Sequence, residues 1–339
     1  MEDNIFITGS AGFIGYHLSK RLIAKGKNVI GLDNLNTFYD LSLKQARLDD
    51  LNKLNGNFKF YHDDIENIEC LEKIFREYNP KIVFNLAAQA GVRYSISDPD
   101  IFTKTNILGF NNILSICSKS NIKHLIYASS SSVYGGNESL PYTEKSSVDH
   151  PVSIYAATKK ANELYAHCYS HLYSLPITGL RFFTVYGPWG RPDMAYFLFT
   201  KSILEGRKIN IFNSGEMYRD FTFIDDIIES LIRVMNKPPQ KNIKFDRKRP
   251  SCDSSWAPHR IFNIGNSNSI KLINFIEIIE KELGVKAIKN YLPMQPGDVK
   301  ATFSDNSLLE SWINYKPATS IEDGIKKFIN WYIDFYKIN

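Results

Sequence analysis

The segment ITGSAGFIG at residues 7–15 decides the fold of this 339-residue chain. A short apolar run precedes it and an amphipathic stretch follows it, which predicts a strand, a tight turn and a helix. Its three glycines let the backbone turn tightly, approach a pyrophosphate closely and pack the helix on the strand. The N-terminus of that helix offers unpaired N–H groups and a positive dipole end to phosphate oxygens. The segment therefore predicts the phosphate-binding turn of a nucleotide-binding sheet.

The same alternation of apolar runs and amphipathic stretches continues over the first 180 residues, as in chains that build a parallel sheet from βαβ units. The predicted strands are 4–8, 28–32, 57–61, 81–86, 123–129 and 176–182. The predicted helices, with apolar residues three and four apart, are 13–25, 42–53, 67–77, 100–119 and 153–173. We therefore expect an α/β fold whose N-terminal domain, 1–182, is a doubly wound parallel sheet of the Rossmann type.

Beyond residue 182 the regularity loosens, with prolines, glycine turns and shorter strands. Helices are predicted near 194–205, 225–236, 271–283 and 320–336. We expect a smaller C-terminal α/β lobe, 183–339, that binds substrate, with some strand or helix returning to the first domain. The stretch 236–260 has prolines, a basic cluster and no periodicity, which is typical of a long surface loop. Its charges could also steer an anionic ligand.

An acidic residue at the end of the second predicted strand indicates which dinucleotide is bound. Asp33 lies eighteen residues after the last glycine of the turn, where a carboxylate can accept both ribose hydroxyls and would repel a 2′-phosphate. This favours NAD over NADP, although an aspartate that only forms a turn fits the position too. Asp64 could hold the adenine edge or simply cap a helix. The small residues at 86–88 would let the dinucleotide lie against the strand tips.

Tyr155 and Lys159 form a Y-x-x-x-K pair that shares one face of a predicted helix. A nearby ammonium group favours the phenolate and lowers the pKa of the tyrosine, which makes Tyr155 a usable general base. The serines at 129–132 follow a strand at the edge where open α/β sheets bind ligands, so one hydroxyl could share a hydrogen bond with the substrate oxygen. A chance helix pair and a serine-rich loop are the alternatives, and the ordered combination of motifs argues against both.

Composition excludes several other classes of protein. The net charge of +5 comes from 41 basic and 36 acidic residues spread along the chain, not from the basic patch of a nucleic-acid-binding protein. It suits an anionic small substrate, and equally a soluble surface. The four cysteines lie far apart, which predicts neither a disulfide framework nor a metal site. Without a signal-like N-terminus or an apolar run of about 18 residues, we expect a cytoplasmic protein with no membrane partner.

These motifs resemble the extended short-chain dehydrogenase/reductases and, within them, the nucleotide-sugar epimerases, above all the UDP-glucuronate 4-epimerases. The similar segments cover nearly the whole chain: ITGSAGFIGYHL, GLDNLNTFYDLSLK, AAQAGVRYS, YASSSSVYG, DHPVSIYAATKKANE, LRFFTVYGPWGRPDMA, RDFTFIDDI, FNIGNS and LPMQPGDV. The resemblance implies an isomerase that uses NAD and acts on a UDP-sugar.

The resemblance also implies roles for particular residues. Tyr155 would be the acid/base, Lys159 would position the nicotinamide ribose and tune Tyr155, and Ser130 would be the hydroxyl partner. Tyr155 would take the proton of the sugar 4-OH while hydride passes from C4 to NAD⁺, and the 4-keto sugar would turn and be reduced on its other face. The residues that match cofactor-contacting positions are Gly9, Gly12, Phe13, Ile14, Gly15, Asp33, Asn34, Asp64, Ile65, Leu86, Ala87, Ala88, Asn106, Phe182 and Val185.

Relatives share the 4-keto intermediate and diverge afterwards. Decarboxylating and dehydrating relatives typically have an acidic residue just before the position of Val133, whereas this chain has Ser131 and Ser132. Neutral hydroxyls can hydrogen-bond a sugar carboxylate without repelling it, which favours conversion of UDP-glucuronate to UDP-galacturonate. The alternatives are a C4 epimerase of UDP-N-acetylglucosamine or its uronic acid, UDP-glucuronate decarboxylase, and an NAD-binding regulatory protein without turnover.

Arginines in family-like segments would supply the counter-charges for a sugar nucleotide, because a guanidinium matches phosphate and carboxylate oxygens as a planar fork. We assign Arg191 and Arg219 to the diphosphate side of the substrate, and place Gln89, Arg93 and Thr184 nearer the sugar. Asp298 either reaches the substrate or is an ordinary loop aspartate.

Two predicted helices, 100–119 and 153–173, carry more apolar residues than one sheet-facing stripe requires. The resemblance implies a homodimer through a four-helix bundle of these helices. The alternative is that the second lobe of the same chain covers them. The surplus apolar residues include Ile107, Phe110, Leu114, Tyr165, Tyr169 and Tyr173.

Overall fold

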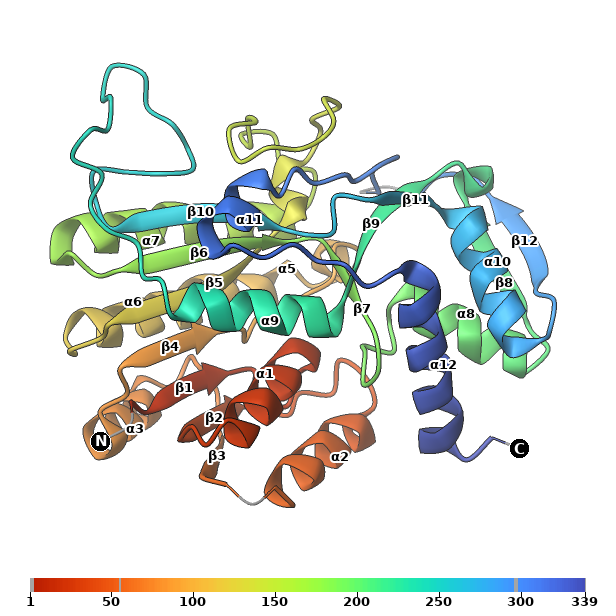
Figure 1. Cartoon of the computed structure of the whole chain (residues 1–339), viewed down its shortest axis with the longest axis horizontal. Helices are drawn as coiled ribbons and strands as arrows, with labels where there is room; N and C mark the ends of the chain where they lie inside the picture. Colours follow the sequence, from red (N-terminus) through yellow and green to blue (C-terminus); the bar gives the residue numbers. More distant parts are fainter. Residues whose placement is uncertain (1–2, 55, 296–297, 339) are drawn as a thin grey trace.

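The computed structural model describes residues 3–54, 56–295 and 298–338 and is built around a seven-stranded parallel sheet (Figure 1). Its strand order is β10-β6-β5-β4-β1-β2-β3, so the order reverses between β1 and β4, where doubly wound sheets bind their ligands. The strands are β1 Ile5–Thr8, β2 Val29–Asp33, β3 Phe58–His62, β4 Ile82–Asn85, β5 His124–Ser130, β6 Ile177–Phe182 and β10 His259–Ile264. The predicted fold class and the six predicted strands are confirmed.

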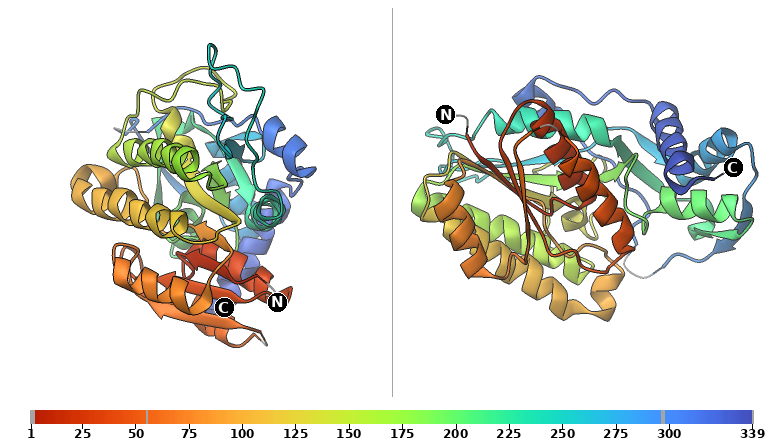
Figure 2. Two further views of the ribbon diagram at one scale, coloured as in Figure 1. Left: turned by 90° about the vertical axis from the view of Figure 1, so that its left-hand side faces the viewer. Right: turned by 90° about the horizontal axis from the view of Figure 1, so that it is seen from below.

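Helices cover both faces of this sheet because side chains alternate along each strand (Figure 2). Ile5 and Ile7 face the core shared with α1 and α9, whereas Phe6 faces the core shared with α3 and α6. The helices of the first half are α1 Phe13–Ala24, α2 Leu41–Asn52, α3 Ile68–Tyr78, α6 Phe110–Ser118 and α7 Ile154–Tyr173. Two short helices, α4 Tyr94–Ser97 and α5 Pro99–Phe102, were not predicted.

The helix predicted over 100–119 is not one continuous α-helix. It consists of α5, a π-helical segment Thr103–Gly109 and then α6. Such wide turns occur often at functional sites. Here the wide turn carries Asn106, whose buried side chain accepts a hydrogen bond from the backbone N–H of Gln89 and donates to its carbonyl. The segment therefore anchors the loop that follows β4.

Some elements of the second half of the chain form two smaller sheets with their helices, and others pack on the large sheet. A three-stranded sheet, β11-β9-β7, and a two-stranded sheet, β12-β8, carry helices α8, α10 and α12 at one end of the molecule (Figure 1). In addition, β10 pairs with β6 in the large sheet, and α9 packs against α1. The division of the chain at residue 182 stays a prediction.

In this second half, four of the described helices begin and end within one residue of a predicted helix, whereas α11 was not predicted. The strands are β7 Thr184–Tyr186, β8 Lys208–Phe212, β9 Tyr218–Phe223, β11 Ser269–Lys271 and β12 Ile288–Leu292. The helices are α8 Ala195–Leu204, α9 Ile224–Met235, α10 Leu272–Leu283, α11 Ser307–Ile313 and α12 Ile321–Tyr336. Between α9 and β10 the chain forms the predicted loop, which projects from the body of the molecule (Figure 1). Among the described residues, no helix is both long and apolar enough to cross a membrane.

Candidate active site

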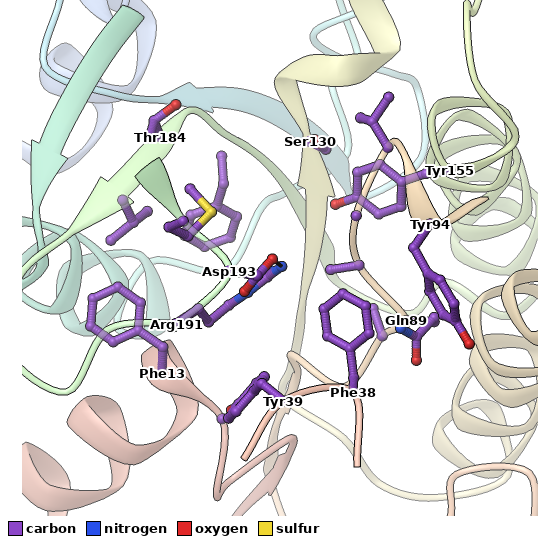
Figure 3. A pocket seen from close by; sticks show the side chains of 18 of the residues that line it. Phe13, Phe38, Tyr39, Gln89, Tyr94, Ser130, Tyr155, Thr184, Arg191 and Asp193 are labelled. Carbon is purple, nitrogen blue, oxygen red and sulfur yellow. Dashed lines mark hydrogen bonds and ion pairs between the residues drawn. The ribbon is translucent and has the colours of Figure 1, made fainter. Parts of the chain in front are cut away.

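A cavity of about 1050 Å³ opens at the carboxyl ends of the large sheet, between this sheet and the smaller sheets (Figure 3). The reversal of strand order between β1 and β4 creates it, because the loops that follow these two strands diverge there. Every predicted site residue except Asn106 lines this cavity. The lining residues from the prediction are Gly9, Gly12, Phe13, Ile14, Gly15, Asp33, Asn34, Asp64, Ile65, Leu86, Ala87, Ala88, Gln89, Arg93, Ser130, Ser131, Ser132, Tyr155, Lys159, Phe182, Thr184, Val185, Arg191, Arg219 and Asp298.

The glycine turn between β1 and α1 has the shape that a dinucleotide requires. Gly9 has a φ of +70°, and a Cβ there would lie 2.8 Å from the backbone nitrogen of Ala87. A Cβ on Gly12 would lie 2.9 Å from the carbonyl oxygen of Gly9, and one on Gly15 would clash with the same oxygen. Gly12 is also the N-cap of α1 and has no side chain to occupy the helix N-terminus. The turn is therefore open to a phosphate group and fits the pyrophosphate of NAD.

Asp33 is held in the cavity wall by the backbone of two loops. Its carboxylate accepts hydrogen bonds from the N–H groups of Ala11 (3.1 Å) and Leu35 (2.9 Å), and the residue is 6% exposed. The remaining lone pairs of the carboxylate can accept the ribose hydroxyls of adenosine. Asn34 donates to the carboxylate of Asp64 at 2.7 Å, which ties the end of β2 to the loop after β3. Both residues were predicted to contact the cofactor, and Asp64 was the one expected at the adenine edge or as a helix cap.

Lys44 of α2 is a cavity residue that the sequence did not indicate. Its Nζ lies 3.7 Å from the Asp33 carboxylate and donates to the side-chain oxygen of Asn36 at 2.9 Å. Burial lowers the pKa of Lys44, while the Asp33 carboxylate opposes that change. Because α2 reads as an ordinary amphipathic helix, no local signal separates this lysine from a surface residue.

Tyr155 and Lys159 lie on one face of α7, near its N-terminus. The helix begins after Ser153, whose hydroxyl accepts a hydrogen bond from the N–H of Ala156 at 3.1 Å. The Tyr155 hydroxyl points into the cavity towards Ser130 (Figure 3). The Nζ of Lys159 donates to the carbonyl oxygen of Ala128 at 2.9 Å. The three predicted catalytic residues are thus brought together by α7 and the end of β5.

The electrostatic prediction for Tyr155 needs a correction. Burial raises the pKa of Tyr155, and the groups that oppose this rise are the Ser130 hydroxyl and the Arg191 guanidinium, not Lys159. Lys159 directs its ammonium group at a backbone carbonyl of β5, and burial lowers its own pKa to about 8. Spacing on a helix placed the two side chains on one face, but it could not show where each polar end points.

Ser131 and Ser132 begin the 3-10 turn Ser131–Tyr134 that follows β5, and both line the cavity. The turn is fixed to the strand because the Ser130 hydroxyl accepts a hydrogen bond from the N–H of Ser132 at 3.1 Å. The turn therefore presents three hydroxyl groups, and no carboxylate, beside Tyr155.

Arg93, Arg219 and Asp298 meet at the end of the cavity formed by the second half of the chain. An Nη of Arg93 lies 2.9 Å from the Asp298 carboxylate, and the guanidinium stacks on the ring of Phe212 with 4.9 Å to its centroid. Arg219 of β9 lies within electrostatic reach of both residues. Burial lowers the pKa of Arg219, and Asp298 opposes that change. This cluster provides two guanidinium groups for an anionic ligand.

Arg191 lies deeper in the cavity, between the nucleotide turn and Tyr155 (Figure 3). It forms an ion pair with Asp193, with Nε–Oδ1 at 3.0 Å and Nη2–Oδ2 at 2.6 Å. Burial acts to lower the pKa of Arg191, but the Asp193 carboxylate outweighs it and raises that pKa. Arg191 therefore lies near Tyr155, and Arg93 lies beside Arg219; which arginine meets the diphosphate and which the sugar stays a prediction.

Asn106 does not line the cavity. Its side chain lies behind the wall, bonded to the backbone of Gln89 and donating to the hydroxyl of Thr158 at 3.1 Å. Asn106 is 2% exposed, and its contact with a dinucleotide stays a prediction. The resemblance predicted a cofactor contact, whereas in this structure Asn106 supports the loop that forms the cavity wall.

Aromatic side chains complete the wall in ways that no motif indicated. Phe38 and Tyr94 face each other with 5.1 Å between ring centroids, and Arg191 lies 5.8 Å from the Phe38 ring. Asp193 and Phe212 were missed as well. Each of these residues looks like an ordinary loop or core residue in sequence, so only the assembled cavity identifies them. The cavity-lining residues that the sequence did not predict include Phe38, Lys44, Tyr94, Asp193 and Phe212.

Comparison with known proteins agrees with this geometry. Residues 5–265 match the model of the NAD dependent epimerase/dehydratase family. The chain belongs to this family. It is 52% identical over 333 residues to Protein CapI of Staphylococcus aureus, covering 98% of this chain and 99% of the relative. It is 45% identical over 332 residues to a probable UDP-glucuronate 4-epimerase of Rhizobium meliloti, covering 98% of this chain and 97% of the relative.

A solved structure of this family has the same fold over the full chain. The UDP-glucuronic acid 4-epimerase of Bacillus cereus, in complex with UDP-glucuronic acid and NAD, superposes with a TM-score of 0.86. The alignment covers 98% of this chain and 100% of that chain, at 32% sequence identity. The family membership therefore extends from sequence to three-dimensional structure.

Proposed function

We propose that this protein is an NAD-dependent UDP-glucuronate 4-epimerase, an isomerase that converts UDP-glucuronate and UDP-galacturonate into each other. The observation that carries the proposal is the group of hydroxyls at the end of β5, Ser130 to Ser132, beside the Tyr155 phenol in a cavity with a dinucleotide turn. The names of the similar proteins from Rhizobium meliloti and Bacillus cereus support the substrate class.

The residues of the chain divide the chemistry between them. Tyr155 takes the proton of the sugar 4-hydroxyl and later returns it, and the Ser130 hydroxyl stabilises the phenolate by donating a hydrogen bond to it during the reaction. Lys159 is held by Ala128 close to the nicotinamide end of the cavity, where its charge suits a ribose hydroxyl. A bound NAD would supply the acceptor and donor of the C4 hydride. The net reaction is inversion at C4, with no consumption of cofactor.

Epimerisation requires the 4-keto sugar to present both faces to the same cofactor. The UDP portion would remain fixed by Arg219 and Arg93 at the outer end of the cavity, while the sugar turns about the diphosphate linkage. We infer that Gln89, Thr184 and Arg191 line the space in which the sugar turns, since all three face the cavity (Figure 3). Asp298 orients Arg93 through their ion pair.

The hydroxyls of Ser131 and Ser132 explain why the 4-keto sugar would be reduced again at C4 and would not undergo elimination. A decarboxylating or dehydrating site needs an acid/base near C5, and the turn after β5 offers neutral donors instead. Asp193 is the nearby carboxylate, but it is paired with Arg191 by two short contacts. The sugar carboxylate can accept hydrogen bonds from the serines without charge repulsion.

We also propose that the protein is a homodimer. Leu164, Tyr165, Leu172 and Tyr173 on α7 are exposed, as is Leu108 of the neighbouring π-helical segment. Such a concentration of apolar side chains supports an interface. Two residues of the prediction do not belong to it, because Phe110 and Leu114 are buried against the chain's own sheet. The cytoplasmic location stays a prediction from the sequence.

One experiment tests the proposed reaction and substrate together. The purified protein is incubated with UDP-glucuronate and catalytic NAD, and the nucleotide sugars are identified by NMR, with UDP-glucose and UDP-N-acetylglucosamine in parallel. UDP-galacturonate is the expected product. UDP-xylose or a persistent 4-keto-pentose would refute the role of the serines, and turnover of the uncharged sugars alone would refute the uronate specificity. Absence of all turnover would favour a regulatory NAD-binding protein.

A further inference from the structure

A fully buried ion pair lies behind the active-site cavity and has no direct part in the chemistry described above. Arg181 of β6 contacts Glu163 of α7 through two parallel bonds, Nε–Oε1 at 2.8 Å and Nη2–Oε2 at 2.9 Å. Their side chains are 0% and 2% exposed, and neither residue lines the cavity. Removing two charges from water costs several kcal/mol per ion, so this pair is weak evidence for stability alone.

The pair is bonded to the strand and the turn that carry the catalytic serines. The Ser129 hydroxyl donates to Glu163 Oε1 at 2.8 Å, and Ser129 is the register partner of Arg181 across β5 and β6. On its other side, Arg181 Nη1 contacts the Tyr134 hydroxyl at 3.0 Å. Tyr134 ends the turn that begins with Ser131 and donates to Asn263 of β10 at 2.6 Å. The guanidinium therefore connects α7, β5, β6, this turn and β10.

Glu163 also continues the row of catalytic side chains on α7. Tyr155, Lys159 and Glu163 are spaced by four residues, so they lie on one face of the helix. The position of α7 along β5 consequently sets the distance between the Tyr155 hydroxyl and Ser130. Apolar packing between a helix and a sheet tolerates small sliding movements, whereas a two-bond carboxylate–guanidinium contact has a single favoured geometry.

We propose that Ser129, Tyr134, Glu163 and Arg181 form a positioning clamp, which locks α7 onto the end of β5 and so holds Tyr155 in line with Ser130 for proton transfer. The proposal rests on the proposed function, because it assigns the clamp a role in that reaction. These are positioning residues, and they act on the reaction through Tyr155 and Ser130. A displacement of about 1 Å between reacting groups can reduce a rate by about 100-fold.

The test removes both charges of the buried Glu163–Arg181 pair at once. Single variants, Glu163→Gln and Arg181→Met, are expected to be destabilised because each leaves one partner unpaired. The double variant, Glu163→Leu with Arg181→Met, replaces both charges by apolar groups and is expected to melt within a few degrees of the wild type. Glu229→Gln, which breaks the partly buried ion pair with Arg233 on α9, is the matched control.

The clamp predicts a specific kinetic result for the double variant. Its kcat should fall about 10- to 100-fold while the KM for UDP-glucuronate and the affinity for NAD change less than about threefold, since binding groups remain in place. The Glu229→Gln control should keep the wild-type kcat. A folded double variant with wild-type kcat would overturn the proposal, and so would a loss of NAD affinity that equals the loss of kcat.

A titration without substrate separates this proposal from the proposed function. Tyrosinate absorbance is followed against pH in the wild type and the double variant, each compared with the same protein carrying Tyr155→Phe to isolate Tyr155. The groups that face its hydroxyl are Ser130 and Arg191, which both favour the phenolate. If the clamp fails, the Ser130 hydrogen bond weakens and Tyr155 ionises at higher pH. An unchanged titration would overturn the clamp even if UDP-glucuronate proves not to be the substrate.

Discussion

The two ends of the active-site cavity are built in different ways. The cofactor end consists mainly of backbone: a glycine turn, the N-terminus of α1 and strand ends that lie next to one another in the sheet. The substrate end consists of charged side chains from separate segments, held by ion pairs such as Arg93–Asp298 and Arg191–Asp193. Backbone geometry suits a ligand that stays bound, whereas side chains can release one ligand and accept another. A substitution at one end should therefore weaken the binding of one ligand and leave the binding of the other unchanged.

Tyr155 lies where the two ends meet, and its removal should have the largest effect. Tyr155→Phe deletes the proton acceptor and the hydrogen bond to Ser130, but it adds no bulk. We expect kcat to fall about 1000-fold, within the range for lost general acid–base catalysis. The affinities for NAD and UDP-glucuronate should stay within about threefold. Steady-state kinetics and calorimetric titration measure this, and an active variant would exclude the proposed acid/base.

Gly12→Ala should damage the cofactor end alone. The new Cβ would lie 2.9 Å from the Gly9 carbonyl oxygen, so the turn must shift away from the phosphate position. Strain of this kind predicts NAD affinity lower by about 10- to 100-fold. UDP affinity should hardly change, as measured by calorimetry with each ligand. Gly136→Ala is the matched control, because its Cβ would meet nothing closer than 3.8 Å.

Arg219→Met should show the opposite pattern. It removes a half-buried guanidinium from the substrate end while keeping most of the apolar volume. Losing a hydrogen bond to a charged phosphate predicts UDP-sugar affinity lower by about 10- to 100-fold. NAD affinity should remain within about twofold. If both ligands weakened equally, the separation of the cavity into two ends would be wrong.

Replacing Ser131 and Ser132 together by alanine tests specificity within the substrate end. We expect the KM for UDP-glucuronate to rise about tenfold, because the sugar carboxylate loses its hydroxyl donors. UDP-glucose, which has no carboxylate, should be affected much less. Competition kinetics with both sugars measures the ratio, and an equal loss for the two would refute contact with the carboxylate.

A smaller effect concerns acid stability. His17 of α1 contacts the carbonyl of Pro188 at 2.9 Å, and burial lowers its pKa to about 3. Burial lowers the pKa of His124 to about 4. Below pH 6.5 these histidines are protonated in the unfolded chain but stay neutral in the folded chain. The free energy of unfolding therefore falls as the pH decreases from 6.5 towards the pKa values of the folded state. Urea unfolding followed between pH 7 and 4 measures this, and His124→Gln should reduce the slope.

Much of the cofactor end was predictable because its signals are local. The glycine turn, Asp33 and the Y-x-x-x-K pair each occupy one short segment, and the parallel sheet places the ends of such segments at one edge. For the substrate end, the sequence predicted which residues belong to it but not which of them contact one another. Arg93 and Asp298 are 205 positions apart in the sequence, and nothing local pairs them.

The sequence by itself therefore determined the fold class and predicted the cofactor turn and the three candidate catalytic residues, because periodicity and backbone requirements act over a few residues. Only the tertiary structure decided that Asn106 supports the cavity wall, that Arg191 lies near the Tyr155 hydroxyl while Lys159 contacts the Ala128 carbonyl, and that Glu163 meets Arg181 behind the site. Those relations depend on where side chains from distant segments end, and packing of the whole chain sets these positions.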